Sequence, residues 1–97
     1  MSCYFLIDTY IDPKRGRGEY DAYIELVKPI VESFGGEYIV RSENVASLSP
    51  LRNPDRVIII RFPSRKDLNA CFGSEEYKKI QEKRIGSVDA RGVIAEG

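Results

Sequence analysis

The side chains best suited to ligand chemistry include two arginines at informative spacings. Arg84 follows Tyr77 and Ile80 at helical intervals, which predicts that its guanidinium shares their inward-facing stripe. It then either pairs with Asp89, or extends to the surface, or binds the carboxylate or enolate of a small ligand as a bidentate fork. Arg41 is either a solvated residue at the end of a strand or a residue at the mouth of a cleft.

Two tyrosines and two aspartates complete this set of candidates. Tyr38 and Tyr77 are either core aromatics whose hydroxyls reach water or groups that orient a ligand carbonyl. Asp8 lies on an otherwise apolar strand, so it is either an interface residue paired with an arginine such as Arg61 or a general base with a raised pKa. The predicted ligand-binding residues are Tyr38, Arg41, Tyr77 and Arg84, and the candidate catalytic residues are Asp8 and Asp89.

The composition excludes several other chemistries. The 97-residue chain contains no His, so it has no Ser-His or Cys-His dyad, no imidazole metal site and no proximal histidine for haem. Its two cysteines, Cys3 and Cys71, are far apart and too few for a disulfide framework or a zinc site. We expect both to be small buried residues in a reducing cytoplasm, and we expect no metal and no cofactor.

Charge and hydropathy argue against nucleic acid and membrane partners. Fifteen Lys and Arg residues balance 15 Asp and Glu residues, whereas nucleic acid and anionic lipid select for clustered positive charge. The N-terminal apolar run at residues 3–7 has no basic flank and lacks the roughly 18 residues of a membrane span. We therefore expect a cytoplasmic protein that binds neither nucleic acid nor membrane.

The first half of the chain predicts a strand, a helix and a second strand that position these candidates. Residues 3–11 are rich in aromatic and β-branched types and alternate between two faces. Apolar residues recur every three or four positions between residues 18 and 34, which predicts an amphipathic helix that ends at Gly35. Residues 37–41 predict a short strand with Tyr38 and Val40 on one face and Ile39 and Arg41 on the other.

The second half predicts a central strand, two helical segments and a final strand. The β-branched run at residues 56–62 predicts a central strand covered on both faces. Ser64 and Ser74 are good helix N-caps, and Gly73 separates the helices that they begin. Residues 87–96 predict an edge strand because Gly92 weakens it. The order β-α-β-β-α-(α)-β over residues 1–97 predicts a single α+β domain of the ferredoxin-like type with an antiparallel sheet.

A ferredoxin-like fold covers one face of its sheet with helices and leaves the other face bare. Tyr4, Leu6, Val57 and Ile59 are expected on the bare face, where they form a large apolar patch for a soluble monomer. A chain below about 100 residues also buries little of its surface alone. We therefore expect a homodimer in which two such sheets pack face to face.

Short segments spread over nearly the whole chain carry a family resemblance. They are YFLI at residues 4–7, the helix with Tyr20 and Tyr23, FGGEYIVR at 34–41, IRFPS at 60–64, ACF at 70–72, SEEY at 74–77, Arg84, and IAEG at 94–97. Together they resemble the domain-of-unknown-function 1330 family, which is related to the dimeric α+β barrels. The resemblance implies a homodimer with two packed sheets and implies no established reaction.

Two classes of function follow from these observations. Wider relatives of the resembled family, including quinone-forming monooxygenases and muconolactone isomerases, bind small organic ligands in a cleft between sheet and helices. The first hypothesis is therefore a protein that binds a small organic molecule there, or transforms it without a cofactor. The alternative is a non-catalytic dimerisation or ligand-sensing module. The residue types alone name no reaction.

Overall fold

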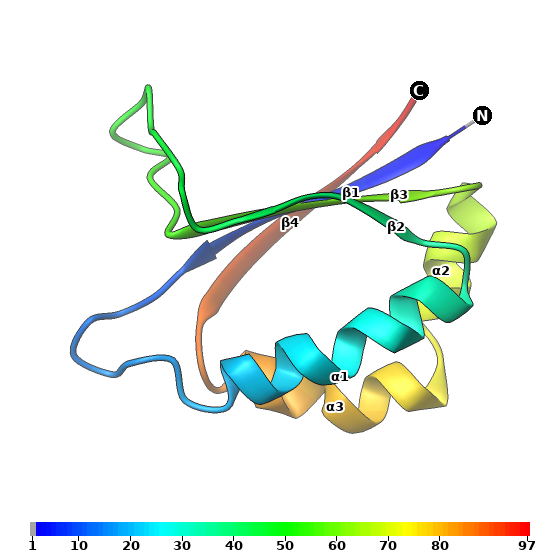
Figure 1. Ribbon diagram of the computed structural model, residues 1–97, viewed down its shortest axis with the longest axis horizontal. Coiled ribbons are helices and arrows are strands. Elements are labelled where there is room, and N and C mark those ends of the chain that lie inside the picture. The colour runs from blue at the N-terminus through cyan, green and yellow to red at the C-terminus, as the bar shows by residue number, and fades with distance from the viewer. Residues whose placement is uncertain (1) are drawn as a thin grey trace.

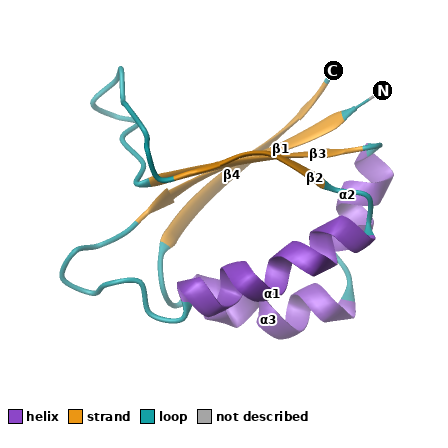
Figure 2. Ribbon diagram, in the orientation of Figure 1, coloured by secondary structure: helices purple, strands orange, loops and turns teal. Residues whose placement is uncertain are grey.

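The computed structural model describes residues 2–97 as two layers, a sheet and a set of helices. All three helices lie on one side of the sheet, and the long loop over residues 43–55 rises on the opposite side (Figure 1, Figure 2). The elements in chain order are β1 (Cys3–Tyr10), α1 (Tyr20–Ser33), β2 (Glu37–Ser42), β3 (Arg56–Phe62), α2 (Arg65–Phe72), α3 (Glu75–Ile85) and β4 (Asp89–Glu96).

The strands pair antiparallel in the order β2-β3-β1-β4, which confirms the predicted α+β, ferredoxin-like fold. β3 and β1 are the central strands, and β4 is an edge strand as its Gly92 predicted. Across the sheet, Leu6 lies opposite Ile59 on one side and opposite Val93 on the other. These three side chains therefore point to the same face.

The hydrophobic core lies between the sheet and the helices. Cys3 and Thr9 of β1 are fully buried under the helices, and Phe5 between them contacts Phe72 of α2 at 4.7 Å between ring centroids. The odd-numbered side chains of β1 therefore face the helices, and its even-numbered side chains face away. The buried apolar residues are Cys3, Tyr20, Tyr23, Ile24, Val27, Val31, Ile60, Phe62, Leu68, Cys71, Tyr77 and Ile80.

The central strand β3 differs from its prediction on one face. Ile60 and Phe62 are buried beneath the helices, whereas Val57 and Ile59 on the opposite face are only half-buried. The helices of this chain therefore cover β3 on one side. A β-branched run indicates a strand that packs on both faces, but it does not say that both covers come from the same chain.

The predicted alternation of β2 is wrong because the strand contains a β-bulge. Tyr38 pairs with Ile60 and Val40 with the adjacent Ile59, so Ile39 is an extra residue in the ladder. The bulge returns Arg41 to the helix-facing side, where its Cζ lies 5.5 Å from the centroid of the Tyr38 ring. Tyr38 and Arg41 thus share one face, and Val40 lies on the other.

Helix ends agree closely with the predicted caps. The Ser64 hydroxyl accepts a hydrogen bond from the Asp67 amide at 3.2 Å, and the Ser74 hydroxyl accepts one from the Tyr77 amide at 3.2 Å. Beyond the C-terminus of α1, Gly35 takes a φ of 84°, the left-handed conformation expected there. These caps set the start of α3 and the direct return of the chain into β2.

Substitution of Gly36 tests how closely the chain packs where it turns from α1 into β2. A Cβ at this position would overlap Val31 Cγ1 and lie 2.9 Å from the Val31 carbonyl oxygen and 3.0 Å from Phe62 Cε1. We expect Gly36→Ala to lower the free energy of unfolding by about 1–3 kcal/mol through overpacking. In the control Gly86→Ala, the nearest atom to the new Cβ is 3.9 Å away, so its stability should change little. Denaturant unfolding measures both variants, and equal stabilities would refute the tight packing at Gly36.

Candidate functional site

Helices α1 and α3 bring two tyrosines and an arginine together. The hydroxyls of Tyr23 and Tyr77 lie 3.0 Å apart and are hydrogen bonded, and both side chains are buried. The Cζ of Arg84 lies 6.0 Å from the centroid of the Tyr23 ring. The stripe predicted for α3 is confirmed, since Tyr77 and Ile80 are buried and Arg84 is partly buried two turns after Tyr77.

An apolar cavity of about 30 Å³ lies between this group and the sheet. The Tyr23 and Tyr38 phenols bring the polar atoms of its wall, and the remaining lining is aliphatic or phenyl. A space of this size holds about one water molecule, so it marks a place where the core is incompletely packed. Its lining residues are Phe5, Ile7, Tyr23, Val27, Val31, Tyr38, Ile58, Ile60 and Phe72.

Burial keeps the phenols of this site protonated. Removal from water raises the pKa of Tyr38 to about 12, although the nearby Arg41 guanidinium opposes the rise. Burial, followed by the neighbouring Tyr77, raises the pKa of Tyr23 well above its ordinary value, and Arg84 only partly offsets that rise. Both phenols are therefore protonated at neutral pH, and each has a proton that it can donate.

Two guanidinium groups between the sheet and the helices each have an unused hydrogen-bond donor. Within residues 2–97, the buried side-chain nitrogen and oxygen atoms without a partner are Nε of Arg56 and Nε of Arg84. Arg56 is only 6% exposed, and its Cζ lies 5.9 Å from the centroid of the Tyr20 ring. We name these residues the inner cluster: Tyr20, Tyr23, Tyr38, Arg41, Arg56, Tyr77 and Arg84.

The four predicted ligand-binding residues all belong to the inner cluster, from two elements. Tyr38 and Arg41 come from β2, where Arg41 is exposed at the rim, and Tyr77 and Arg84 come from α3. From the sequence, Tyr23 is a residue of the amphipathic helix and of the family resemblance, and Arg56 is not a candidate. A signal for Arg56 was present, because it shares the inward face of its strand with Ile58 and Ile60.

The structure does not bring the two candidate catalytic carboxylates to this cluster. Asp8 lies on the face of β1 opposite the helices, where Arg52 Nε donates to it at 2.6 Å. Arg61, its suggested partner, pairs instead with Glu37 at 2.9 Å.

The second carboxylate, Asp89, is also occupied elsewhere. It begins β4, is 56% exposed and pairs with Arg91 at 2.7 Å rather than with Arg84. Both aspartates are therefore held by arginines outside the inner cluster.

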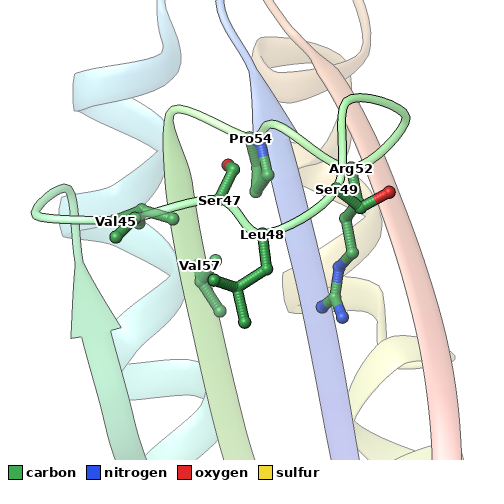
Figure 3. Close-up of a pocket in the computed structure, with 8 residues that line it drawn as sticks. Val45, Ser47, Leu48, Ser49, Arg52, Pro54 and Val57 are labelled. Carbon is green, nitrogen blue, oxygen red and sulfur yellow. The ribbon is translucent and has the colours of Figure 1, made fainter.

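The bare face of the sheet carries a second concave region. The loop over residues 43–55 leans over this face and borders a cleft of about 330 Å³ (Figure 3). Leu48, Arg52 and Val57 point into the space between the loop and the strands. Leu48 and Leu51 are almost fully exposed, at 103% and 90%. The Arg52–Asp8 ion pair ties this loop to the sheet.

Other candidate chemistries find little support in the described part of the chain. Cys3 and Cys71 are free and buried, and burial raises the pKa of the Cys71 thiol to about 11, so it is protonated at neutral pH. Residues 2–97 contain no group of three or more His, Cys, Asp or Glu side chains arranged to hold a metal ion.

None of the helices described here has both the length and the apolar character that crossing a membrane requires.

Comparison with known proteins connects this geometry to a family. The family model named Domain of unknown function (DUF1330) matches residues 4–97. No curated protein matches the chain.

Solved structures show the same fold at low sequence identity. A protein of unknown function from Rhodopseudomonas palustris has a TM-score of 0.80 and 20% identity, covering 99% of this chain and 82% of that one. SnoaB, a cofactor-independent oxygenase from Streptomyces nogalater, has a TM-score of 0.71 and 6% identity, covering 99% and 92%. A dimeric ferredoxin-like protein of unknown function from Jannaschia sp. CCS1 has a TM-score of 0.66 and 14% identity, covering 100% of both chains.

The raised pKa values of Tyr23 and Tyr38 make stability depend on alkaline pH. Their folded-state values exceed the ordinary value of 10, so this contribution is present below pH 10 and is lost as pH rises towards and through about 12. We expect the free energy of unfolding to fall over that range, with a late phase in the tyrosinate absorbance. Tyr38→Phe should reduce the late phase. Tyr23→Phe should cost about 1–3 kcal/mol, because it leaves the Tyr77 hydroxyl unpaired.

The control for this titration is Tyr4→Phe, which removes a phenol from the opposite face of the sheet. It should leave the late phase intact. A late phase that is absent in the wild type, or that Tyr38→Phe leaves unchanged, would contradict the burial of the Tyr38 phenol.

Proposed function

The chain belongs to the DUF1330 family of unknown function, and from the geometry of its own residues we propose that it binds a small organic molecule between the sheet and the helices. The observation that carries this proposal is the apolar cavity lined by Tyr23 and Tyr38, with Tyr77 and Arg84 in contact with Tyr23. A mainly apolar lining with a few directed polar groups is the usual composition of a small-molecule site.

Each polar residue has a distinct role in this proposal. Tyr38 donates one hydrogen bond to a ligand oxygen, and the Tyr23–Tyr77 pair donates a second through the hydroxyl proton that the pair does not use. Arg84 presents its unused Nε donor to a carboxylate or enolate. Arg41 lies at the rim of the site.

An organic ligand must displace part of the cavity wall. The cavity of about 30 Å³ is smaller than such a molecule, so binding requires Tyr38, Phe72 or neighbouring side chains to move. We propose transformation without a cofactor as the reaction to test, since a cofactor-independent oxygenase shares this fold. The two free buried thiols support a cytoplasmic location.

A ligand screen tests the binding proposal. We expect at least one compound in a library of aromatic and keto-acid metabolites to raise the melting temperature saturably, with about 2.7 kcal/mol of stabilisation at one hundred times its Kd. Arg84→Gln and Tyr77→Phe should weaken this effect, whereas Arg61→Gln on the opposite face should not. Failure of the whole library, or an effect unchanged by Arg84→Gln, would reject the site. Ligand density beside Arg84 in crystals of protein taken directly from cells would identify the natural molecule.

The bare face supports a second proposal, that the protein is a homodimer. Leu6, Val57, Ile59 and Val93 form adjoining apolar positions there, and Val93 is 63% exposed. The exposed Leu48 and Leu51 belong to the loop over residues 43–55, which rises on the same side of the sheet (Figure 1). Soluble monomers rarely leave a large apolar patch open, and a two-fold pairing of identical faces would bury it. The related fold from Jannaschia is described as dimeric, which agrees with this proposal.

Charge placed at the centre of the bare face tests the dimer. Leu6→Glu would insert one carboxylate from each subunit near the two-fold axis, where desolvation costs several kcal/mol per ion. We expect light scattering to report a dimer for the wild type and dissociation or unfolding for this variant. Lys14→Glu, in the exposed loop after β1, should remain dimeric. A monomeric wild type, or a stable Leu6→Glu dimer, would show that this face does not mediate association.

The screen and the scattering experiment together separate the binding proposal from the alternative of a pure association module. A dimer that responds to no compound in the library fits the association module. A saturable response that depends on Arg84 fits ligand binding.

A further inference from the structure

We propose that the ligand is an organic anion, that Arg56 binds its negative charge together with Arg84, and that Glu43 occupies part of this position until the anion displaces it. This inference rests on the binding function proposed above. It adds a residue, Arg56, that the sequence did not single out, and it narrows the ligand to a class.

The first support is the incomplete pairing of Arg56. Its side chain is 8% exposed, yet its Nε has no hydrogen-bond partner. Its ion pair is with Glu43, whose Oε2 lies 3.3 Å from Nη1. A buried charge is costly unless it is paired and its donors are satisfied, so this guanidinium has capacity for another acceptor.

The second support is the place of Arg56 in the sheet. It pairs with Thr9 in the register of β1 and β3, and therefore shares the helix-facing side with Ile58 and Ile60. Those two isoleucines line the cavity. The Arg56 charge also acts on the Tyr38 phenol, where it opposes the rise in pKa caused by burial. Arg56 thus faces the same interior as the proposed site.

The third support is that the two unused Nε donors belong to arginines that lie against neighbouring tyrosine rings. Arg56 lies against Tyr20 and Arg84 against Tyr23, and the two rings are stacked with centroids 6.1 Å apart. Arg84 has no carboxylate within ion-pair distance in the described part of the chain. A neutral ligand would leave this positive charge uncompensated, whereas a carboxylate or enolate would accept from the guanidinium donors.

Glu43 has the properties of a displaceable counterion. Its side chain is 49% exposed at the beginning of the loop after β2, and its other oxygen pairs with Arg17 at 2.7 Å. Loss of the longer Arg56 contact would leave Glu43 with the shorter Arg17 contact. An incoming carboxylate would therefore replace a weak partner of Arg56 without leaving Glu43 unpaired.

The experiment compares benzoate with benzamide, which have similar shape and differ in charge. The Nε–H signals of arginine in nitrogen-15 NMR observe the two unused donors directly, and Arg56→Lys and Arg84→Lys assign them. We expect benzoate to shift both signals saturably and benzamide to shift neither. Arg56→Gln should weaken benzoate binding about tenfold or more, the effect of losing a hydrogen bond to a charged group. Glu43→Gln should strengthen benzoate binding. Arg61→Gln, on the bare face of the sheet, should leave benzoate binding unchanged.

The outcomes distinguish this inference from the function on which it rests. Equal binding of benzamide and benzoate, or benzoate binding that depends on Arg84 but not on Arg56 or Glu43, would overturn the inference and leave the binding site standing. No response of either Nε–H signal to benzoate would also overturn it, even where the metabolite screen finds a neutral ligand. If Arg56→Gln does not fold, Glu43→Gln decides the question, because an affinity no higher than wild type would exclude displacement.

Discussion

The register between β1 and β3 is the constraint on which the rest of the structure depends. Phe5 lies opposite Ile60 and Leu6 opposite Ile59, so one pairing assigns both central strands to two faces at once. Because side chains alternate along a strand, a slip by one residue would move Arg56 out of the interior and expose the core face. The inner cluster and the bare apolar face are therefore two results of a single alignment.

Most of the fold could be predicted from local patterns. Helical spacing placed Tyr77 and Arg84 on one stripe, and Ser74 marked where α3 begins. The β-bulge at Ile39 could not be predicted, because it depends on how β2 pairs with β3 rather than on the composition of either strand. The bulge has a structural consequence, since it places Arg41 beside Tyr38 rather than on the opposite face of the sheet.

Contacts between side chains that are distant in sequence were harder to predict than the helices and strands. Asp8 pairs with Arg52, 44 residues away, because the loop after β2 folds back over the bare face. No spacing rule links those positions. Arg56 was missed for a different reason, since a charged residue at the start of a strand is usually solvated. Its alternation with Ile58 and Ile60 indicates the inward face, and its burial in the structure shows that orientation directly.

The inner cluster has an energetic cost that the remaining core must offset. Each buried donor without a partner costs about 1–3 kcal/mol, and domains of this size are stable by only about 5–15 kcal/mol. The faces of Tyr20 and Tyr23 reduce this cost through cation–π attraction to Arg56 and Arg84. Aromatic rings cannot accept in the plane of the guanidinium, however, so the Nε donors stay unused. This pattern is consistent with residues selected for a ligand rather than for stability alone.

The loop over residues 43–55 relates the two faces of the sheet to each other. Near its start, Glu43 contacts Arg56 of the inner cluster, and near its end, Arg52 holds Asp8 on the bare face. Its exposed Leu48 and Leu51 lie between these two anchors. A second copy that covers the bare face would therefore lie against the loop that carries Glu43, the residue we propose an anion displaces. If both proposals hold, association and ligand binding would involve one stretch of backbone, from Glu43 to Arg52, and we expect each to affect the other.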